Sequence, residues 1–256
     1  MQVAEPGPAI DPIEQFKLGR YLHVIVGNAD VSITTSTIFM AIIAGLTIWL
    51  MSLTAKGTTG VPGRMQALGE MSYEFVEGMV RSAAGEDAMR FFPMVFTIFM
   101  FVLIANLIGF FPYSFTVTSH IIITAALALV VFFTVVIYGI KEHGLHFFKM
   151  FVPSGVPWPA LILVVPIEII SFLSRPVSHS VRLFANMLAG HITLYVFGGF
   201  VVMLLGASAV VKLVAILPFA MAIGLEALEL LVAFLQAYVF AMLTCMYLND
   251  ALHPGH

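Results

Sequence analysis

Ionisable and polar side chains recur at regular spacing inside two long apolar stretches in the second half of the chain. In the first stretch, Glu168, Arg175 and Arg182 are seven residues apart. In the second stretch, Glu229 and Gln236 are also seven residues apart. Seven residues return to nearly the same face of an α-helix. Because a charge at the centre of a bilayer costs at least about 2.5 kcal/mol, we expect both polar stripes to face protein or water and to serve the function.

Further polar residues extend the two stripes. They are Ser171, Ser178 and Asn186 in the first stretch and Glu226, one turn before Glu229, in the second. His191 follows Arg182 by nine residues and is therefore expected on a different side of the helix. Two polar stripes on neighbouring helices predict aqueous pockets on either side of Arg182.

These residue types differ in the proton chemistry that they can do. A guanidinium stays protonated because its pKa exceeds about 12. A fixed positive charge at Arg182 would block the passage of protons and still pair transiently with a carboxylate. Histidine and glutamate have pKa values that their surroundings tune to the working pH, so they can pass protons on. The sequence therefore predicts a barrier that does not titrate, flanked by relays that do.

The composition of the whole chain indicates a membrane protein. Of its 256 residues, 61% are hydrophobic and 10% are charged, whereas soluble domains have about 45–50% apolar and roughly 25% charged residues. The single cysteine, Cys245, excludes an intramolecular disulfide framework. The net charge of -3 and the lack of a basic stripe argue against a nucleic-acid partner. The N-terminal segment lacks the basic and apolar regions of a signal peptide.

We expect an all-α integral membrane protein with a single membrane domain, 1–256. About 20 apolar residues are needed for a helix to cross a bilayer. The expected elements are a polar arm (1–31), a transmembrane helix (32–54), an amphipathic helix along the membrane interface (64–85), a transmembrane hairpin (91–140) and two long apolar segments (160–200 and 208–250).

The two long segments have about twice the length that one perpendicular span requires. Each segment therefore either breaks into two spans or forms one strongly tilted helix. No proline lies between Val177 and Leu217, and the polar residues inside both segments are unsuited to lipid. Both facts favour a hairpin of two long, tilted helices packed against a protein partner.

Lysine and arginine residues predict the orientation in the membrane. The segments 56–90 and 141–149 carry Lys56, Arg64, Arg81, Arg90, Lys141 and Lys149. The opposite side carries Lys17, Arg20 and Lys212. The positive-inside rule then places the N-terminus outside and both basic segments in the cytoplasm, with the C-terminus on the cytoplasmic side as well.

Three strings of the sequence resemble subunit a of the ATP synthase membrane sector, of the alphaproteobacterial or mitochondrial-like type. They are SRPVSHSVRLFANMLAGH (Ser174 to His191), ALELLVAFLQAYVFAMLTCMYL (Ala227 to Leu248) and ANLIGFFPYSF (Ala105 to Phe115). Their order and spacing extend the resemblance over essentially the whole chain.

The resemblance implies a proton-translocating stator subunit of a rotary ATP synthase in a bacterial inner membrane. Such a subunit stands beside a ring of c subunits and contacts the peripheral-stalk b subunits and lipid. It loads protons onto ring carboxylates through one half-channel and unloads them through another, which couples proton flow to rotation and ATP synthesis. The chain itself shows no phosphate-cradling loop, so it is expected to be a non-catalytic subunit without cofactor or metal.

The resemblance also implies roles for single residues. Arg182 aligns with the indispensable arginine of the family, Asn186 with its supporting asparagine, and Gln236 with the glutamine that faces it. Glu168 aligns with an acidic residue near the cytoplasmic exit path.

His191 and Glu229 stand where the enterobacterial pattern has glutamate and histidine, so the two residue types are exchanged. The pair keeps its chemistry, which predicts that the two side chains work together in the inlet half-channel.

Structural roles remain alternatives for several of these residues. Arg182 could instead form a structural ion pair with Glu226 or Glu229, and Glu226 could be a second channel carboxylate. Arg175 could extend toward the membrane surface or hold Glu168.

Three further expectations concern polar residues without a firm family role. The hydroxyls of Ser171 and Ser178 could bond the carbonyl four residues back rather than line a channel. His179 is expected to face solvent or a partner. Asn106, inside a span, is expected to bond a neighbouring helix.

Other function classes fit the sequence less well. A secondary transporter would show internal repeats with broken helices at matching places, and none is evident. A metalloprotease would need H-E-x-x-H, which KEHGLH (141–146) does not match. His143 and His146 have a metal-like spacing, but two histidines make half a site.

Overall fold

A computed structural model describes residues 20–22, 25–26, 29–30, 33–55, 63–111, 114–152 and 157–253. Most of the described chain is helical. The α-helices are α1 (Thr35–Ala55), α2 (Arg64–Ala84), α3 (Phe92–Gly109), α4 (Ile121–His143), α5 (Trp158–Leu205), α6 (Ala209–Val214) and α7 (Ile216–Leu252). Short 3-10 segments are η2 (Glu86–Phe91), η3 (Val117–Ser119) and η4 (Gly144–Phe151). Among the described residues, 5 helical segments are long and apolar enough to cross a membrane, which confirms the expected helical membrane fold.

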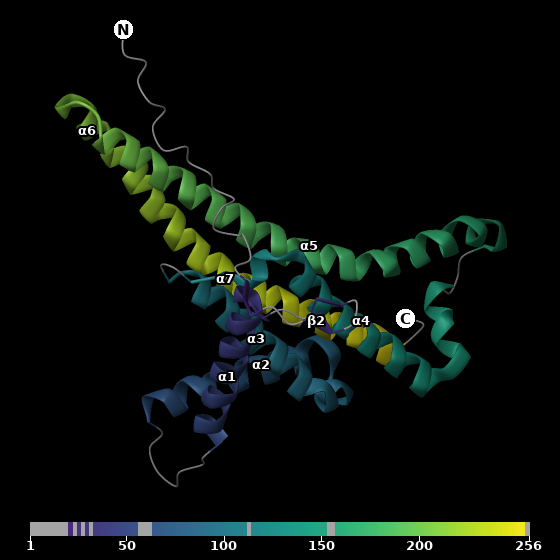
Figure 1. Ribbon diagram of the computed structural model, residues 1–256. Coiled ribbons are helices and arrows are strands. Elements are labelled where there is room, and N and C mark those ends of the chain that lie inside the picture. The colour runs from purple at the N-terminus through teal and green to yellow at the C-terminus, as the bar shows by residue number, and fades with distance from the viewer. Residues whose placement is uncertain are drawn as a thin grey trace.

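The two long apolar segments form two very long helices rather than four short spans. Helix α5 runs without interruption for 48 residues, and α7 runs for 37. Pro166 and Pro176 lie inside α5, where each lacks the N–H that would bond the carbonyl four residues earlier. Helix α5 is visibly bent in Figure 1. The short helix α6 connects α5 to α7 at one tip of this hairpin (Figure 1).

Four very short strands precede α1. Three of them lie in the expected polar arm (1–31), and β4 lies at the start of the segment expected as a transmembrane helix (32–54). β1 (Arg20–Leu22) pairs with β4 (Ile33–Thr34), and β2 (Ile25–Val26) pairs with β3 (Ala29–Asp30), both antiparallel. They form two nested ladders that sequence patterning did not indicate. The rest of the expected arm, with Lys17, and the turn with Lys56 lie outside the described residues.

Helix α2 has the amphipathic pattern expected from its sequence. Val76, Met79 and Val80 are buried, whereas Arg81 pairs on the surface with Glu77 at 2.9 Å. The helix ends at Gly85, whose φ of 76° closes a bond from its N–H to the Arg81 carbonyl. The position of α2 along a membrane interface stays a prediction.

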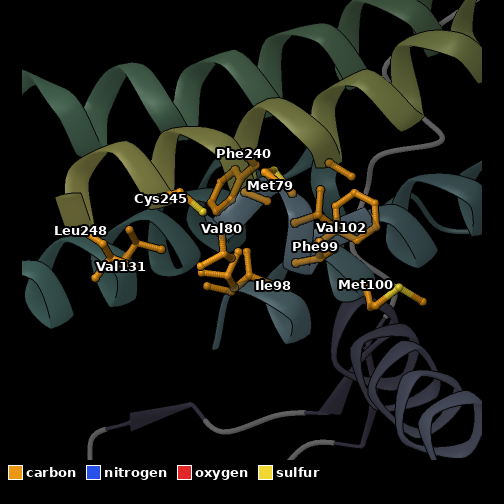
Figure 2. Close-up of a cluster of buried hydrophobic side chains, with 14 of the residues drawn as sticks. Met79, Val80, Ile98, Phe99, Met100, Val102, Val131, Phe240, Cys245 and Leu248 are labelled. Carbon is orange, nitrogen blue, oxygen red and sulfur yellow. The ribbon is translucent and has the colours of Figure 1, made fainter. Parts of the chain in front are cut away.

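Helix α7 lies at the centre of the fold and contacts α2, α3, α4 and α5. Figure 2 shows the resulting core, in which side chains of α7 lie against those of three other helices. The labelled members are Phe240, Cys245 and Leu248 of α7, Met79 and Val80 of α2, Ile98, Phe99, Met100 and Val102 of α3, and Val131 of α4. These apolar contacts hold α7 against α2, α3 and α4, and α5 in turn packs against α7.

Polar contacts join three elements at one end of the bundle. Nε2 of His143, at the end of α4, lies 3.0 Å from the Leu252 carbonyl oxygen at the end of α7. Nε2 of His253 lies 3.9 Å from Oδ2 of Asp87 in η2. The end of α4, the start of η2 and the end of α7 therefore lie on the same side of the molecule.

Candidate functional site

Arg182 lies on a face of α5 that is turned away from the rest of the chain. Its side chain is exposed, and so is that of Asn186, one turn further along. On the other side of the same helix, Leu183 and Met187 are buried. Within the described chain, Arg182 has no hydrogen bond or ion pair. The alternative in which Arg182 pairs with Glu226 or Glu229 is therefore not found.

Ser171 and Ser178 are exposed on the same helix. Neither hydroxyl bonds a backbone carbonyl within the described residues, so the expectation that they bond the preceding turn is wrong. Serines at neighbouring positions do so instead. Ser174 Oγ donates to the Ser171 carbonyl at 2.7 Å, and Ser180 Oγ donates to the Val177 carbonyl at 3.0 Å.

His179 does not face solvent, so that expectation is also wrong. Its side chain is 3% exposed, and its ring centroid lies 3.7 Å from that of Phe240 on α7, edge to face. The physical reason is helical phase, because His179 precedes the buried Leu183 by four residues and shares its side of α5. The expectation relied on the polar residue type of His179, whereas its position on the helix faces the core.

Arg175 points to α7 and not to Glu168. Its Nη1 donates to Oδ2 of Asp250 at 2.7 Å. The guanidinium also lies over two aromatic rings, 5.3 Å from the centroid of Phe172 and 5.0 Å from that of Tyr247. Arg175 thus links α5 to the end of α7. The alternative in which it holds Glu168 is wrong. Glu168 is half-buried.

His191 on α5 and Glu229 on α7 lie next to each other. Nε2 of His191 is 3.7 Å from Oε1 of Glu229. Glu229 is buried, and neither of its carboxyl oxygens has a hydrogen-bond partner. A Cβ added at Gly190 would lie 2.5 Å from that same Oε1. The missing side chain of Gly190 therefore creates the space that the Glu229 carboxyl occupies against α5.

A third side chain joins this pair from the turn between α3 and α4. Oγ1 of Thr116 lies 2.9 Å from Nε2 of His191, and Thr116 is buried. A Cβ added at Gly109, at the end of α3, would lie 3.0 Å from Oγ1 of Thr116 and 3.3 Å from Nε2 of His191. Sequence reasoning missed Thr116, because a threonine in a turn between two helices carries no spacing signal.

Asn106 bonds α7, as expected from its place inside a span. Its Nδ2 donates to the Ala233 carbonyl at 3.1 Å, and its Oδ1 accepts from Oγ1 of Thr118 at 2.9 Å. Asn106 is fully buried. These bonds hold the backbone of α7 between Glu229 and Gln236, and Gln236 is itself buried.

Glu226 is exposed and lies in an open, mainly apolar groove of about 630 Å³. The groove is lined by Phe110 and Leu194 and by Ala222, Ile223, Glu226, Ala227 and Leu230 of α7. Leu194 is one turn from His191, and Glu226 is one turn from Glu229. The groove therefore runs beside the His191–Glu229 pair with a carboxylate in its wall.

His120 ends the same turn that carries Thr116. Its ring stacks on Phe115 with centroids 4.8 Å apart, and burial lowers its pKa. Among the residues that the structure describes, no group of three or more His, Cys, Asp or Glu side chains is arranged to hold a metal ion.

Together these residues place a permanent cation and titratable groups at different heights of one helix pair. Arg182 presents a fixed positive charge on an outer face. His191 and Glu229 can exchange a proton once a small movement closes the gap between them. The nine residues from Arg182 to His191 correspond to roughly 13 Å along the helix, so the two groups lie at separate heights of the helix pair.

Known proteins are similar to this chain over most of its length. Residues 34–249 match the family described as ATP synthase A chain. Proteins named ATP synthase subunit a are similar over nearly their full length. The one from Mesorhizobium japonicum is 60% identical over 96% of this chain and 98% of its own. Those from Chelativorans sp. and Nitrobacter hamburgensis are each 59% identical, over 97% and 96% of this chain and 100% of their own.

Proposed function

The chain belongs to the ATP synthase A chain family, and we infer that protons pass along it to reach the rotating part of the membrane sector. It is a multi-pass membrane protein and a non-catalytic, proton-translocating stator subunit of that complex. Its own residues would bind, hold back and hand over protons, while ATP chemistry belongs to other subunits.

The exposed Arg182 carries this proposal. A guanidinium on an outer face of a membrane helix is costly unless a partner covers it, and no carboxylate of the described chain does so. A ring of c subunits, each with a carboxylate at the same depth, supplies a neutralising charge that is renewed as the ring turns. The exposed Ser178 and Asn186 extend the polar surface toward that ring.

Two half-channels on either side of Arg182 follow from the heights of the other polar residues. His191 and Glu229 form the relay of the inlet half-channel, with Glu226 in the groove beside them. Glu168 lies on the opposite side of Arg182 along α5 and belongs to the outlet. Gln236 is buried on α7 and, with Asn186, belongs to the barrier region around Arg182.

The fixed charge of Arg182 makes transfer to the ring obligatory. A proton that slipped past it would dissipate about 2.3 kcal/mol per 100 mV of membrane potential. A cation that never releases its own proton blocks that path and pairs with a ring carboxylate only when the carboxylate is unprotonated. Proton flow then does work as rotation instead of being lost as heat.

The proposed orientation places the N-terminus in the periplasm of a bacterial inner membrane and the C-terminus in the cytoplasm. The contacts of His143 with Leu252 and of His253 with Asp87 bring three chain segments to one end. Positively charged Arg90 and Lys141 lie in the same segments, which supports a cytoplasmic location for that end. We place the peripheral-stalk b subunits and lipid on apolar faces of the bundle away from Arg182.

Disulfide cross-linking to the ring tests the proposed contact face. In a Cys245→Ala background, single cysteines replace Ser178 or Asn186 on the exposed side of α5, and Leu183 or Met187 on the buried side. A second cysteine is placed in the c subunit beside its carboxylate. We expect oxidation to cross-link the ring to positions 178 and 186 and not to positions 183 and 187. Cross-links of equal yield from both sides, or none from the exposed side, would overturn the proposal.

A further inference from the structure

One nitrogen of His191 has two polar neighbours from two different elements. Nε2 lies 2.9 Å from Oγ1 of Thr116 in the turn before α4 and 3.7 Å from Oε1 of Glu229 on α7. Only the shorter of these distances allows a hydrogen bond. The imidazole is therefore hydrogen-bonded to the Thr116 hydroxyl and lies slightly too far from the Glu229 carboxyl for a hydrogen bond.

We propose that Thr116 is a positioning residue for proton transfer, whose hydroxyl holds the His191 imidazole in place before and after its Nε2 gains or loses a proton. The proposal rests on the proposed function, because it assigns a task within the relay of His191 and Glu229. Thr116 does not itself take up the translocated proton.

The chemistry of a hydroxyl suits this task. A hydroxyl has one hydrogen to donate and two lone pairs to accept with, and it rotates to suit its partner. When Nε2 of His191 is unprotonated, Oγ1 of Thr116 donates to it; when Nε2 carries a proton, Oγ1 accepts. A hydrogen bond is available in both protonation states, so the ring is held beside Glu229 before and after the transfer. During the transfer itself, the single donor or acceptor site of Nε2 turns from Oγ1 of Thr116 to the Glu229 carboxyl.

The turn holds the threonine firmly enough to do this. Thr116 is buried, and its carbonyl accepts hydrogen bonds from the Ser119 hydroxyl at 2.6 Å and from the Ser119 backbone N–H at 3.2 Å. Gly109 leaves the space in which Thr116 and His191 meet, since a Cβ there would lie within 3.3 Å of both side chains. The position of the Thr116 hydroxyl is therefore fixed by a hydrogen-bonded turn.

Two substitutions at position 116 separate the hydroxyl from the volume of the side chain. Thr116→Val keeps the shape and removes the hydroxyl, whereas Thr116→Ser keeps the hydroxyl and removes a methyl group. Proton-driven ATP synthesis is measured in membrane vesicles that contain the whole complex, at matched amounts of the subunit. We expect Thr116→Val to lower the rate by about ten- to a hundred-fold, the scale of a misplaced reacting group, and Thr116→Ser to retain most of it.

A valine variant as active as the native protein, or a serine variant as impaired as the valine one, would overturn the proposal. The same substitution in a His191→Ala background gives a second test. There, Thr116→Val should cause no further loss, because the hydroxyl acts through the imidazole; an equally large further loss would contradict that.

The His191→Ala variant alone also separates this inference from the proposed function. If it kept native activity, the relay itself would be wrong. If it lost activity while Thr116→Val did not, the relay would stand and only the role of Thr116 would be wrong.

Discussion

Nε2 of His191 and Oε1 of Glu229 are 3.7 Å apart, which is too far for a hydrogen bond and less than 1 Å beyond a good one. The carboxyl is buried without a hydrogen-bond partner, an arrangement that costs free energy. A relay needs such a pair, because a bond that closes only during transfer does not trap the proton on either group. In the proposed function, the short distance between these two side chains is the gap that closes during transfer.

Exchanging the two residue types tests whether the pair acts as a unit. We expect His191→Glu with Glu229→His to retain more proton-driven ATP synthesis than either single substitution. Each single variant leaves two like groups facing each other, whereas the double variant restores one carboxyl and one imidazole. Rates in membrane vesicles decide the matter: a double variant no better than the poorer single one would end the claim of a paired relay.

Gly190 should be intolerant of even one methyl group. A Cβ at this position would lie 2.5 Å from Oε1 of Glu229, so Gly190→Ala forces the carboxyl or the helix to move. Overpacking of this kind costs about 1–3 kcal/mol, and we expect a loss of proton-driven synthesis of about tenfold or more.

Gly198→Ala is the matched control for Gly190→Ala. Gly198 lies on the same helix, and a Cβ added there would have none of the neighbouring side chains within 4 Å. The control should behave like the native protein in the same assay. Equal effects of the two substitutions would show that helix propensity, and not contact with Glu229, is responsible.

Removing Arg175 should destabilise the protein more than removing its ion-pair partner Asp250. Asp250 is partly exposed, so Asp250→Asn is expected to cost less than about 1 kcal/mol. Arg175→Ala also removes the contacts of the guanidinium with Phe172 and Tyr247, worth roughly a further 0.5–1 kcal/mol. Thermal inactivation of the detergent-solubilised complex should therefore begin at a lower temperature for Arg175→Ala; the reverse order would contradict the stacking.

Much of the fold could be predicted because an apolar segment in lipid must satisfy its backbone hydrogen bonds internally, and a helix does so within one segment. The length of apolar segments and the spacing of polar ones along α5 and α7 are readable in the sequence. Which face of α5 packs against α7 is not readable, and that placement decides that His179 turns into the core and that Arg175 meets Asp250. Sequence periodicity predicts which residues share a face of a helix, but not which residues of other helices that face contacts.

The residues of the candidate site likewise fall into those that the sequence indicates and those that it does not. Arg182, His191 and Glu229 stand out because charged and titratable groups are rare in apolar segments. Gly109, Gly190 and Thr116 do not, because glycines in a helix and a threonine in a turn are ordinary. Their contribution appears only when three elements that are distant in the sequence come together around one carboxyl and one imidazole.

The central claim is that Arg182 separates two proton paths and acts on a carboxylate of another subunit. The most direct measurement is proton-driven ATP synthesis by the complete complex with Arg182→Ala, alongside an assay of how much of the variant is assembled in the membrane. We predict normal assembly and no coupled synthesis, because the fixed charge is lost and the fold is not. Coupled synthesis at the native rate by a fully assembled Arg182→Ala complex would contradict the account.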